Sequence, residues 1–350
     1  MSVSSSSATP SPEVSPDVLA PESQDLPHRG RARSVSFASR WSGPILLVAM
    51  MVVFTILEPG VFLTESNLLA VVNNQAITAI VALGLLFPLA SGVFDISIGG
   101  AITLSVISSA AMFNATAGNM PVPVVIVLTL LVGIAAGLVN GLLVIRLSID
   151  PFIVTLGTGS VFLGVSQFIA DGKVISEDIP SAFTDLGRGE TFGIPNPILL
   201  VIVLAVIVFY LLEMTPFGRM IYATGAGREA ARLAGVPTNR LLYIAFLSSA
   251  FFASLAGLVY VSRIGSGQPD IGAQYLLPAY AAAFLGSTMI KPGRFNVLGL
   301  LVGIAILAIG INGLQLRGIP FWVIATFQGG ALILAVVFSK IRSGALSGSR

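Results

Sequence analysis

Asp95 is the residue whose surroundings most suggest a functional site. It lies in the segment SGVFDISIGG (residues 91–100), between two long apolar runs. A carboxylate near a membrane is costly unless it is paired or hydrated. The neighbouring glycines permit a break in a helix or the close approach of another helix. Asp95 and Ser97 therefore predict a site that lines a pore or gate. The alternative is that Asp95 caps a helix by accepting its free N–H groups, and both can hold.

Asn140, Asn312 and Gln268 are further polar candidates for a path through the protein. The two asparagines lie inside apolar runs, where an amide more often hydrogen-bonds between helices than contacts a solute. Gln268 belongs, with Asp270, to the glycine-rich segment RIGSGQPDIGAQY (residues 263–275). That segment suits contact with a polar solute or a binding protein, although a plain connecting loop is the simpler interpretation.

A basic segment at residues 214–240 is the third candidate. It carries four arginines and a single acid, Glu229. The residues from Glu229 to Ala234 favour a short helix, which Gly235 and the following Pro237 would end. A short helix with a small-residue face can dock into a groove of a partner protein. A basic loop can equally lie against anionic lipid head groups, and the residue types leave both alternatives open.

The sequence contains no recognisable catalytic or metal-binding arrangement. There is no cysteine, and the single histidine, His28, lies in a polar stretch near the N-terminus. The phosphate-binding pattern GxxxxGK(S/T) is absent, because the only Gly-Lys pair, Gly172-Lys173, continues into valine. We therefore expect no enzyme, no metal and no cofactor. If ATP drives this protein, a partner subunit must bind it.

The elements that must position these residues are membrane-spanning helices. The chain is 55% hydrophobic and only 10% charged, where a soluble domain is about a quarter charged. A helical span needs roughly 20 apolar residues, and the runs are apolar on all sides, unlike the alternating strands of a barrel. We predict an all-α polytopic bundle of about ten spans. They cover residues 43–60, 68–90, 95–113, 122–145, 151–170, 198–213, 241–262, 273–290, 295–314 and 320–338.

The distribution of basic residues supports this count. If the N-terminus is cytoplasmic, 14 of the 18 lysines and arginines fall on the cytoplasmic side. The other side keeps Lys173, Arg188, Arg263 and Arg317, together with most of the acids in the polar loop 171–197. This is the positive-inside pattern. It predicts a multi-pass protein of a bacterial inner membrane with both termini in the cytoplasm.

Two polar tails flank the predicted membrane domain. Residues 1–40 are rich in serine and proline, which predicts a disordered cytoplasmic tail whose arginines orient the first span. Residues 41–340 form the expected transmembrane domain, with 214–240 as its main cytoplasmic loop. Residues 341–350 form a short cytoplasmic C-terminal tail.

An internal repeat is visible within the membrane portion. Residues 131–154 contain LVGIA, NGL and PFIV, and residues 301–323 contain LVGIA, NGL and PFWV in the same order. The two copies fall five predicted spans apart, on helices of opposite direction. The pattern predicts an inverted repeat, an arrangement by which two halves of a transporter rock about a central site. Coincidence in an apolar alphabet is the alternative.

Several long motifs resemble one known family. They are ALGLLFPLASGVFDISIGG (82–100), GLVNGLLVIRLSIDPFIVTLGTGSVFLG (137–164), TPFGRMIYATGAGREAARLAGVPTNR (215–240) and IGSGQPDIGAQYLLPAYAAAFLGS (264–287). In this order they resemble the permeases of bacterial ABC importers for ribose, xylose, arabinose and related sugars, from about residue 65 to 340.

The resemblance implies a function and a set of partners. Two permease chains pair in the membrane, a cytoplasmic ABC ATPase docks beneath them, and an extracytoplasmic solute-binding protein delivers a sugar-like solute. No nucleic acid is implied. The basic loop resembles the coupling helix that enters the groove of the ATPase, which favours docking over lipid contact. The residues that would carry coupling are Gly218, Arg219, Glu229, Ala230, Ala231, Arg232, Leu233 and Gly235.

The sequence also departs from this family. Leu276 and Pro278 stand where many relatives carry acids, and Lys291-Pro292-Gly293-Arg294 replaces a Gly-Gly-Arg turn. The expected solute is accordingly a monosaccharide, a polyol or another small hydroxylated compound. The main rival is an ion-coupled secondary transporter, which would need several ionisable residues inside its spans. Essentially only Asp95 is available. A channel, an exporter and a membrane enzyme are the remaining alternatives.

Overall fold

The computed structural model describes residues 29–347 and divides the chain into two units, Met1–Phe37 and Ala38–Arg350. Apart from the first residues of α1, everything below concerns the second unit. The expected tail at residues 1–28, with His28, lies outside the described residues. The helices are α1 (Arg29–Leu57), α2 (Glu65–Ala90), α3 (Ile98–Ala115), α4 (Val122–Arg146), α5 (Pro151–Ala170), α6 (Ser181–Arg188), α7 (Asn196–Phe209), α8 (Pro216–Ala226), α9 (Arg228–Leu233), α10 (Thr238–Ile264), α11 (Ala273–Ser287), α12 (Val297–Leu316) and α13 (Phe321–Ser347). A π-helical turn, η2 (Tyr210–Met214), continues α7, and a small hairpin pairs β1 (Glu190–Thr191) with β2 (Ile194–Pro195).

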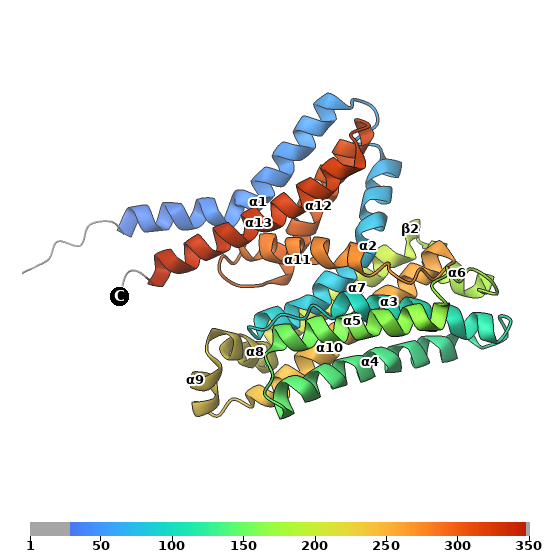
Figure 1. Cartoon of the computed structure of the whole chain (residues 1–350). Helices are drawn as coiled ribbons and strands as arrows, with labels where there is room; N and C mark the ends of the chain where they lie inside the picture. The colour runs from blue at the N-terminus through green and yellow to red at the C-terminus, as the bar shows by residue number, and fades with distance from the viewer. Residues whose placement is uncertain (1–28, 348–350) are drawn as a thin grey trace, which may run out of the picture. The chain divides into compact units, whose positions relative to one another are not determined.

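Each of the ten expected apolar segments contains a helix (Figure 1). Seven described helices are long and apolar enough to cross a membrane: α2, α3, α4, α5, α7 with η2, α10 and α12. The apolar parts of α1 and α13 are shorter, Trp41–Leu57 and Trp322–Val337. Helix α11 has only 15 residues with Pro278 inside it. An all-α polytopic membrane protein is therefore confirmed.

Helix ends differ from the sequence-based predictions at both tails. Helix α1 begins at Arg29, so the last twelve residues of the expected disordered tail are helical. Helix α13 continues to Ser347, into the expected C-terminal tail. In both places the helix extends past the apolar run, since helix propagation requires only residues that keep the backbone hydrogen-bonded and no apolar face.

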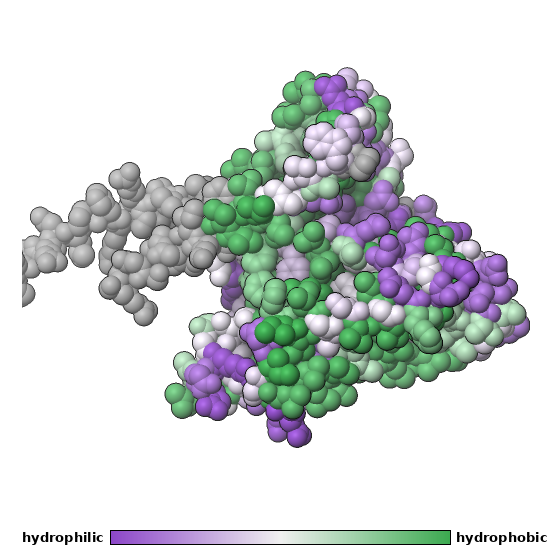
Figure 2. All heavy atoms as spheres, viewed as in Figure 1, coloured by the Kyte–Doolittle hydropathy of each residue, from purple (hydrophilic) through white to green (hydrophobic). Residues whose placement is uncertain are grey.

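Burial separates the helices into an inner and an outer set. Helices α2, α3 and α10 are buried over most of their length. Helices α4, α5 and α7 instead expose many large apolar side chains, such as Ile153 and Val206. Figure 2 shows hydrophobic side chains over the middle of α4 and α5, between hydrophilic groups near α6 and near α9. So large an exposed apolar surface is unusual for a soluble protein and is expected against lipid.

The packing partners form two similar groups. Helix α10 lies at the centre and packs on α2, α3 and α4, while α3 also packs on α5 (Figure 1). In the second group, α11 packs on α12, α13 and α2. Asn296 begins α12 by accepting a hydrogen bond from the backbone N–H of Gly299, 2.7 Å away, as an N-cap does.

Two irregular segments interrupt the bundle between long helices. Residues 91–97 join α2 to α3, and residues 265–272 join α10 to α11. We call them the first break and the second break. Each contains a glycine in the left-handed region, Gly92 at φ 80° and Gly265 at φ 78°. A side chain is strongly disfavoured there, so glycine is what allows the chain to turn.

Glycine also sets the separation of α3 and α5. A Cβ on Gly100 would collide with the backbone carbonyl of Gly159, whereas a Cβ on Gly164 of α5 would meet no atom. We expect Gly100→Ala to lower the melting temperature of the detergent-purified chain by several degrees, because overpacking costs about 1–3 kcal/mol. Gly164→Ala is the matched control and should be neutral or slightly stabilising. Equal melting temperatures for the two variants would contradict the close contact.

Candidate functional site

Asp95 is the centre of a buried hydrogen-bond network. The residue is buried, with only 1% of its surface exposed. The carboxylate oxygen Oδ1 accepts hydrogen bonds from the hydroxyl of Ser97 at 2.5 Å and from the Ser97 backbone N–H at 3.1 Å. Ser97 in turn accepts from the amide of Asn140 at 2.6 Å, and the Asn140 oxygen accepts from the Thr158 hydroxyl at 2.6 Å. Three of the five predicted path residues therefore meet here, from the first break and α4.

The second carboxylate oxygen of Asp95 is not satisfied in the same way. Oδ2 and the hydroxyl oxygen of Ser249 are both buried, and neither has a hydrogen-bond partner among the described residues. Ser249, on α10, nevertheless lies close enough to interact with the carboxylate. A buried unpaired oxygen is costly. The Asp95 carboxylate therefore has one oxygen, Oδ1, with two hydrogen bonds and a second oxygen, Oδ2, that can accept a further one.

Tyr280 of α11 holds the backbone of the first break. Its hydroxyl accepts from the Asp95 backbone N–H at 3.0 Å and donates to the Asp95 carbonyl at 2.9 Å. One side chain thus satisfies both polar groups of one residue. The sequence analysis missed Tyr280, Thr158 and Ser249. The available signal was a tyrosine hydroxyl inside an apolar helix, because such a hydroxyl needs a partner when it is buried.

The helix-cap interpretation of Asp95 is wrong in its strict form. The N-cap of α3 is Ser97, which makes no side-chain capping bond. Asp95 instead accepts the N–H of Ser97 itself, which orders the turn before the helix begins. The carboxylate shapes the break and does not satisfy the first free N–H groups of α3.

The first break lies well inside the bundle. Ser97 contacts Gly159, which is eight residues into α5, and bonds Asn140, which is six residues before the end of α4. At 1.5 Å per residue these positions are about 12 Å and about 9 Å from the helix ends at Pro151 and Arg146. Irregular backbone at such a depth is tolerated only where protein or a water-filled cavity surrounds it. That placement favours a gate over a surface turn.

Asn312 and Gln268 are not part of this network. Asn312 of α12 pairs with Asn67 at the start of α2, each amide donating to the other at 3.1 Å. A hydrogen bond between two helices is the first expectation for an amide inside an apolar helix. Gln268 lies half-buried in the second break. The sequence could not distinguish these positions from Asn140, because all three are amides in an apolar or glycine-rich context.

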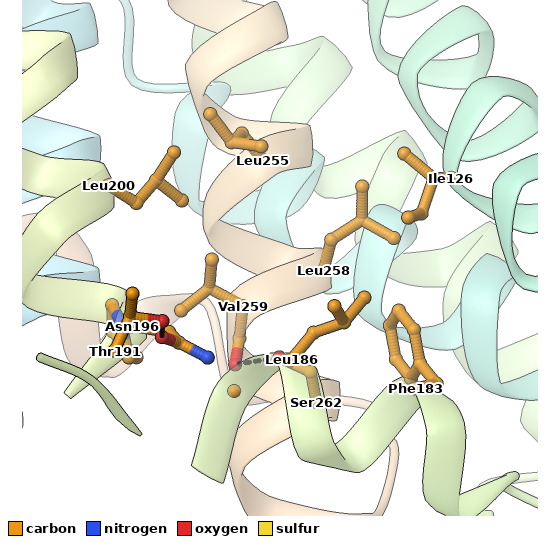
Figure 3. A pocket seen from close by; sticks show the side chains of 12 residues that line it. Ile126, Phe183, Leu186, Thr191, Asn196, Leu200, Leu255, Leu258, Val259 and Ser262 are labelled. Atoms are coloured by element: carbon orange, nitrogen blue, oxygen red, sulfur yellow. Dashed lines mark hydrogen bonds between the residues drawn. The ribbon is translucent and has the colours of Figure 1, made fainter. Parts of the chain in front are cut away.

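Three of the cavities between the described helices differ in the chemistry of their walls. One of about 380 Å³ lies between α4, α6, α7 and α10. Figure 3 shows leucines and Phe183 around it, with Thr191, Asn196 and Ser262 at one end. A second, of about 630 Å³, is lined by apolar side chains apart from Ser248. Both run along the α10 face that looks toward α7. The lining of the second suits an acyl chain better than a hydroxylated solute.

The third cavity is smaller, and it is the one of the three with an acidic side chain in its wall. It measures about 270 Å³ and lies between α3, α5, the second break and the start of α11. Backbone from Gly99, Gly100 and Gly159 lines it together with the side chains of Thr103, Ser160 and Asp270, among others. Few but convergent polar groups on an otherwise apolar wall are typical of a solute site. This cavity therefore adjoins the first break and includes an acid of the second.

The predicted cytoplasmic helix is present and exposed. Helix α9 covers Arg228–Leu233, and Gly235 follows it in the left-handed region at φ 84°. The Val236 N–H bonds the Ala231 carbonyl at 3.0 Å, which completes the expected glycine-terminated helix end. Leu233 is 86% exposed, and Glu229 pairs with Arg232 at 2.9 Å on the surface. Ala231 is buried, whereas Ala230 and Arg219 are exposed.

Helix α8 connects this exposed helix to the first break. A Cβ on Gly225, near the end of α8, would collide with the carbonyl of Ala90. A Cβ on Gly92 would lie 3.1 Å from the Gly225 Cα. At the other end of α8, Gly218 is buried against the Leu212 carbonyl. Because the two backbones touch without a side chain between them, a movement of α8 displaces residues 90–92 directly.

A group of ionic residues joins the π-helical turn η2, just before α8, to the α11–α12 turn. Glu213 is 6% exposed in its side chain, and its Oε2 lies 2.5 Å from Lys291 and 3.6 Å from Arg294. Arg294 also lies over the Tyr222 ring, 3.5 Å from its centroid. Burial, and then the Glu213 charge, raise the pKa of the Tyr222 hydroxyl. The phenol therefore stays protonated and donates to the Phe295 carbonyl at 2.6 Å.

These observations define a polytopic membrane protein with an internal polar break and an exposed short helix. A family described as "Branched-chain amino acid transport system / permease component" matches residues 67–336. The chain belongs to this family of permease components. It is a transporter subunit and not an enzyme, which confirms that part of the sequence analysis. A component of a larger transport system also fits better than a self-sufficient ion-coupled carrier.

Similar proteins cover most of the chain. A ribose import permease protein RbsC of Bacillus subtilis is 34% identical over 303 residues, which is 86% of this chain and 93% of that protein. The Haemophilus influenzae protein of the same name is 30% identical over 296 residues, or 84% and 90%. An autoinducer 2 import system permease protein LsrD of Salmonella paratyphi A is 33% identical over 307 residues, or 85% and 91%. No solved structure matches the chain significantly.

Asp95 offers the most direct test of the buried network. We expect Asp95→Asn to lower solute uptake by about tenfold while membrane abundance falls less than about twofold, because the amide cannot accept both Ser97 hydrogen bonds as strongly. Asp95→Ala should reduce uptake further. Uptake in membrane vesicles and immunoblots of the same vesicles give the two quantities. Proportional loss of both would assign Asp95 to folding alone.

Proposed function

We propose that the chain is the membrane permease of an ABC importer that moves a monosaccharide or a similar small hydroxylated solute inward by alternating access. The observation that carries this proposal is the backbone contact between α8 and the first break, because it joins an exposed docking helix to a buried gate. A movement imposed on α9 is then transmitted through α8 to the segment that holds Asp95. The exposed ends of α9, Glu229 and Leu233, are free to meet a partner.

The nature of the solute is supported by two observations. Two of the similar proteins carry the name ribose import permease, and a third is named for autoinducer 2 import. Inside the bundle, the polar groups near the breaks are mainly hydroxyls and amides, with Asp95 as the buried acid. A neutral hydroxylated compound needs such groups and no counter-ion. An ion-coupled carrier of a small polar solute remains the second candidate, and Asp95 alone favours it.

The assembly that we propose has four kinds of component. An ABC ATPase subunit would bind ATP and dock at α9, with Gly218, Arg219, Arg232 and Gly235 shaping the loop. An extracytoplasmic solute-binding protein would dock on the opposite side. A second permease chain, identical or related, would complete the path, and membrane lipid would cover the apolar faces of α4, α5 and α7. No cofactor or metal is proposed for this chain, and no nucleic acid.

Ten spans and cytoplasmic termini are part of the same proposal. We infer that the shorter helices α1, α11 and α13 join the seven long ones, that the membrane is a bacterial inner membrane, and that α9 and the Lys291–Arg294 turn lie on its cytoplasmic side. The distribution of lysine and arginine supports this orientation.

The packing supports the proposed inverted repeat. Helix α3 packs on α5 and α10, and α11 packs on α13 and α2. Helix α4 packs on α10, and α12 packs on α2. If α2 to α5 correspond to α10 to α13, each of these contacts in one half has its counterpart in the other. Two halves built alike suit a rocking movement about the centre.

Docking at α9 predicts a specific loss of partner. We expect Glu229→Arg combined with Leu233→Asp to abolish copurification of the ATPase and ATP-dependent uptake, because both side chains lie on the exposed helix and a buried charge at an interface is costly. Affinity purification with mass spectrometry, and uptake of a panel of D-ribose, D-xylose and L-arabinose, measure the two effects. Leu147→Asp, an exposed leucine at the end of α4, is the matched control. Retained copurification with normal uptake would refute the docking surface.

Glu213 predicts a different defect. Glu213→Gln leaves Lys291 and Arg294 without their shared carboxylate, so η2, which leads into α8, loses its ionic tie to the α11–α12 turn. We expect ATP hydrolysis by the assembly to persist while the sugar imported per ATP falls about tenfold, within the usual range of coupling free energies. Glu190→Gln, in the hairpin, is the control for loss of one acid. An unchanged ratio of uptake to hydrolysis would show that this tie does not transmit movement.

A further inference from the structure

The two breaks share a local pattern that the sequence repeat did not reveal. Asp95 and Asp270 each lie three residues before a helix begins, at Ile98 for α3 and at Ala273 for α11. Each aspartate is followed by isoleucine and preceded, three residues earlier, by glycine. Under the correspondence of α2 to α5 with α10 to α13, the first break is equivalent to the second. Asp270 is then the structural counterpart of Asp95.

The breaks also hold each other in a reciprocal manner. Tyr280, on α11 after the second break, bonds both backbone groups of Asp95 in the first break. Thr103, on α3 after the first break, accepts the backbone N–H of Gly272 in the second break at 2.9 Å. Each half therefore satisfies the interrupted backbone of the other half. A shift of α3 against α11 would disturb both contacts together.

The environments of the two aspartates are opposite in this structure. Asp95 is 1% exposed and is bonded by Ser97. Asp270 is exposed and forms part of the wall of the 270 Å³ cavity, with Thr103 and Ser160. The cavity thus presents the Asp270 carboxylate and the Ser160 hydroxyl, both exposed, to a bound molecule. The Thr103 hydroxyl is buried and already bonds Gly99 and Gly272, so Thr103 contributes to the wall. A carboxylate can accept hydrogen bonds from two hydroxyls of one solute, and a serine hydroxyl can accept a further one.

We propose that Asp270, with Ser160, forms a contact site for the hydroxylated solute at the outer break, and that Asp95 and Asp270 exchange environments during transport. The proposal rests on the import function given above. In the present state the first break is closed around Asp95 and the second break is open. In the alternate state the first break opens and Asp270 becomes buried, so one gate is always shut.

Cysteine labelling tests this exchange, because the chain has no native cysteine. The two reporter variants are Val93→Cys in the first break and Gln268→Cys in the second. Each lies two residues before its aspartate, and each native residue is half-buried. Ala182→Cys, exposed on α6 outside both breaks, is the control. The experiment uses the full assembly in vesicles, with and without ATP and vanadate, and a small water-soluble thiol reagent on each side.

We expect ATP with vanadate to change the two labelling rates in opposite directions, by about fivefold or more, while the Ala182→Cys rate stays constant. Rates that change in the same direction, or a change at Val93→Cys alone, would overturn the proposal while ATP-dependent uptake stands. Absence of ATP-dependent uptake by the wild-type assembly would instead refute the import function, and the proposal with it.

The solute contact has its own variant. Asp270→Asn should raise the KM for whichever sugar of the panel the wild-type assembly imports by about tenfold, as expected for the loss of a charge-assisted hydrogen bond. Asp185→Asn, an acid of α6 outside the cavity, is the matched control and should keep its KM. An unchanged KM for Asp270→Asn, or a fall in uptake that follows membrane abundance, would overturn the contact.

Discussion

Every interrupted helix inside a membrane must find partners for the backbone groups that the interruption frees, because lipid offers none. The two breaks meet this requirement with side chains from each other's half: Tyr280 serves Asp95, and Thr103 serves Gly272. The close approach of Gly100 to Gly159 brings α5 against the same region. The polar centre of the bundle is therefore a consequence of where its helices stop.

The same requirement explains how a distant surface can influence the centre. Gly225 of α8 lies against residues 90–92 with no side chain between the two backbones. Glu213, Lys291 and Arg294 tie the neighbouring end of α7 to the turn before α12. The segment from η2 to α8 is thus connected to both halves of the protein through contacts of different kinds, one steric and one ionic. A rigid steric contact transmits a displacement, and a partly buried ionic contact keeps the parts in register.

Much of the architecture follows from the sequence, because apolar run length and basic residue distribution are strong physical signals. All ten expected segments contain helices, and α9 begins and ends close to the predicted residues. The site was only partly predictable. Asp95, Ser97 and Asn140 do meet, but Asn312 pairs with Asn67 and Gln268 lies apart. Which buried amide joins which network depends on helix rotation and depth, and an apolar sequence with weak periodicity encodes neither. Tyr280 was missed for the same reason.

The hold that Tyr280 has on the first break uses only the main chain of residue 95. Every amino acid except proline presents the same N–H and C=O there. The two bonds to Tyr280 therefore do not depend on which side chain stands at residue 95, whereas the bonds to Ser97 require the carboxylate. The anchoring of the break to α11 and the polar character of the break are thus set by different atoms of one residue, so a replacement at this position changes the second and leaves the first in place.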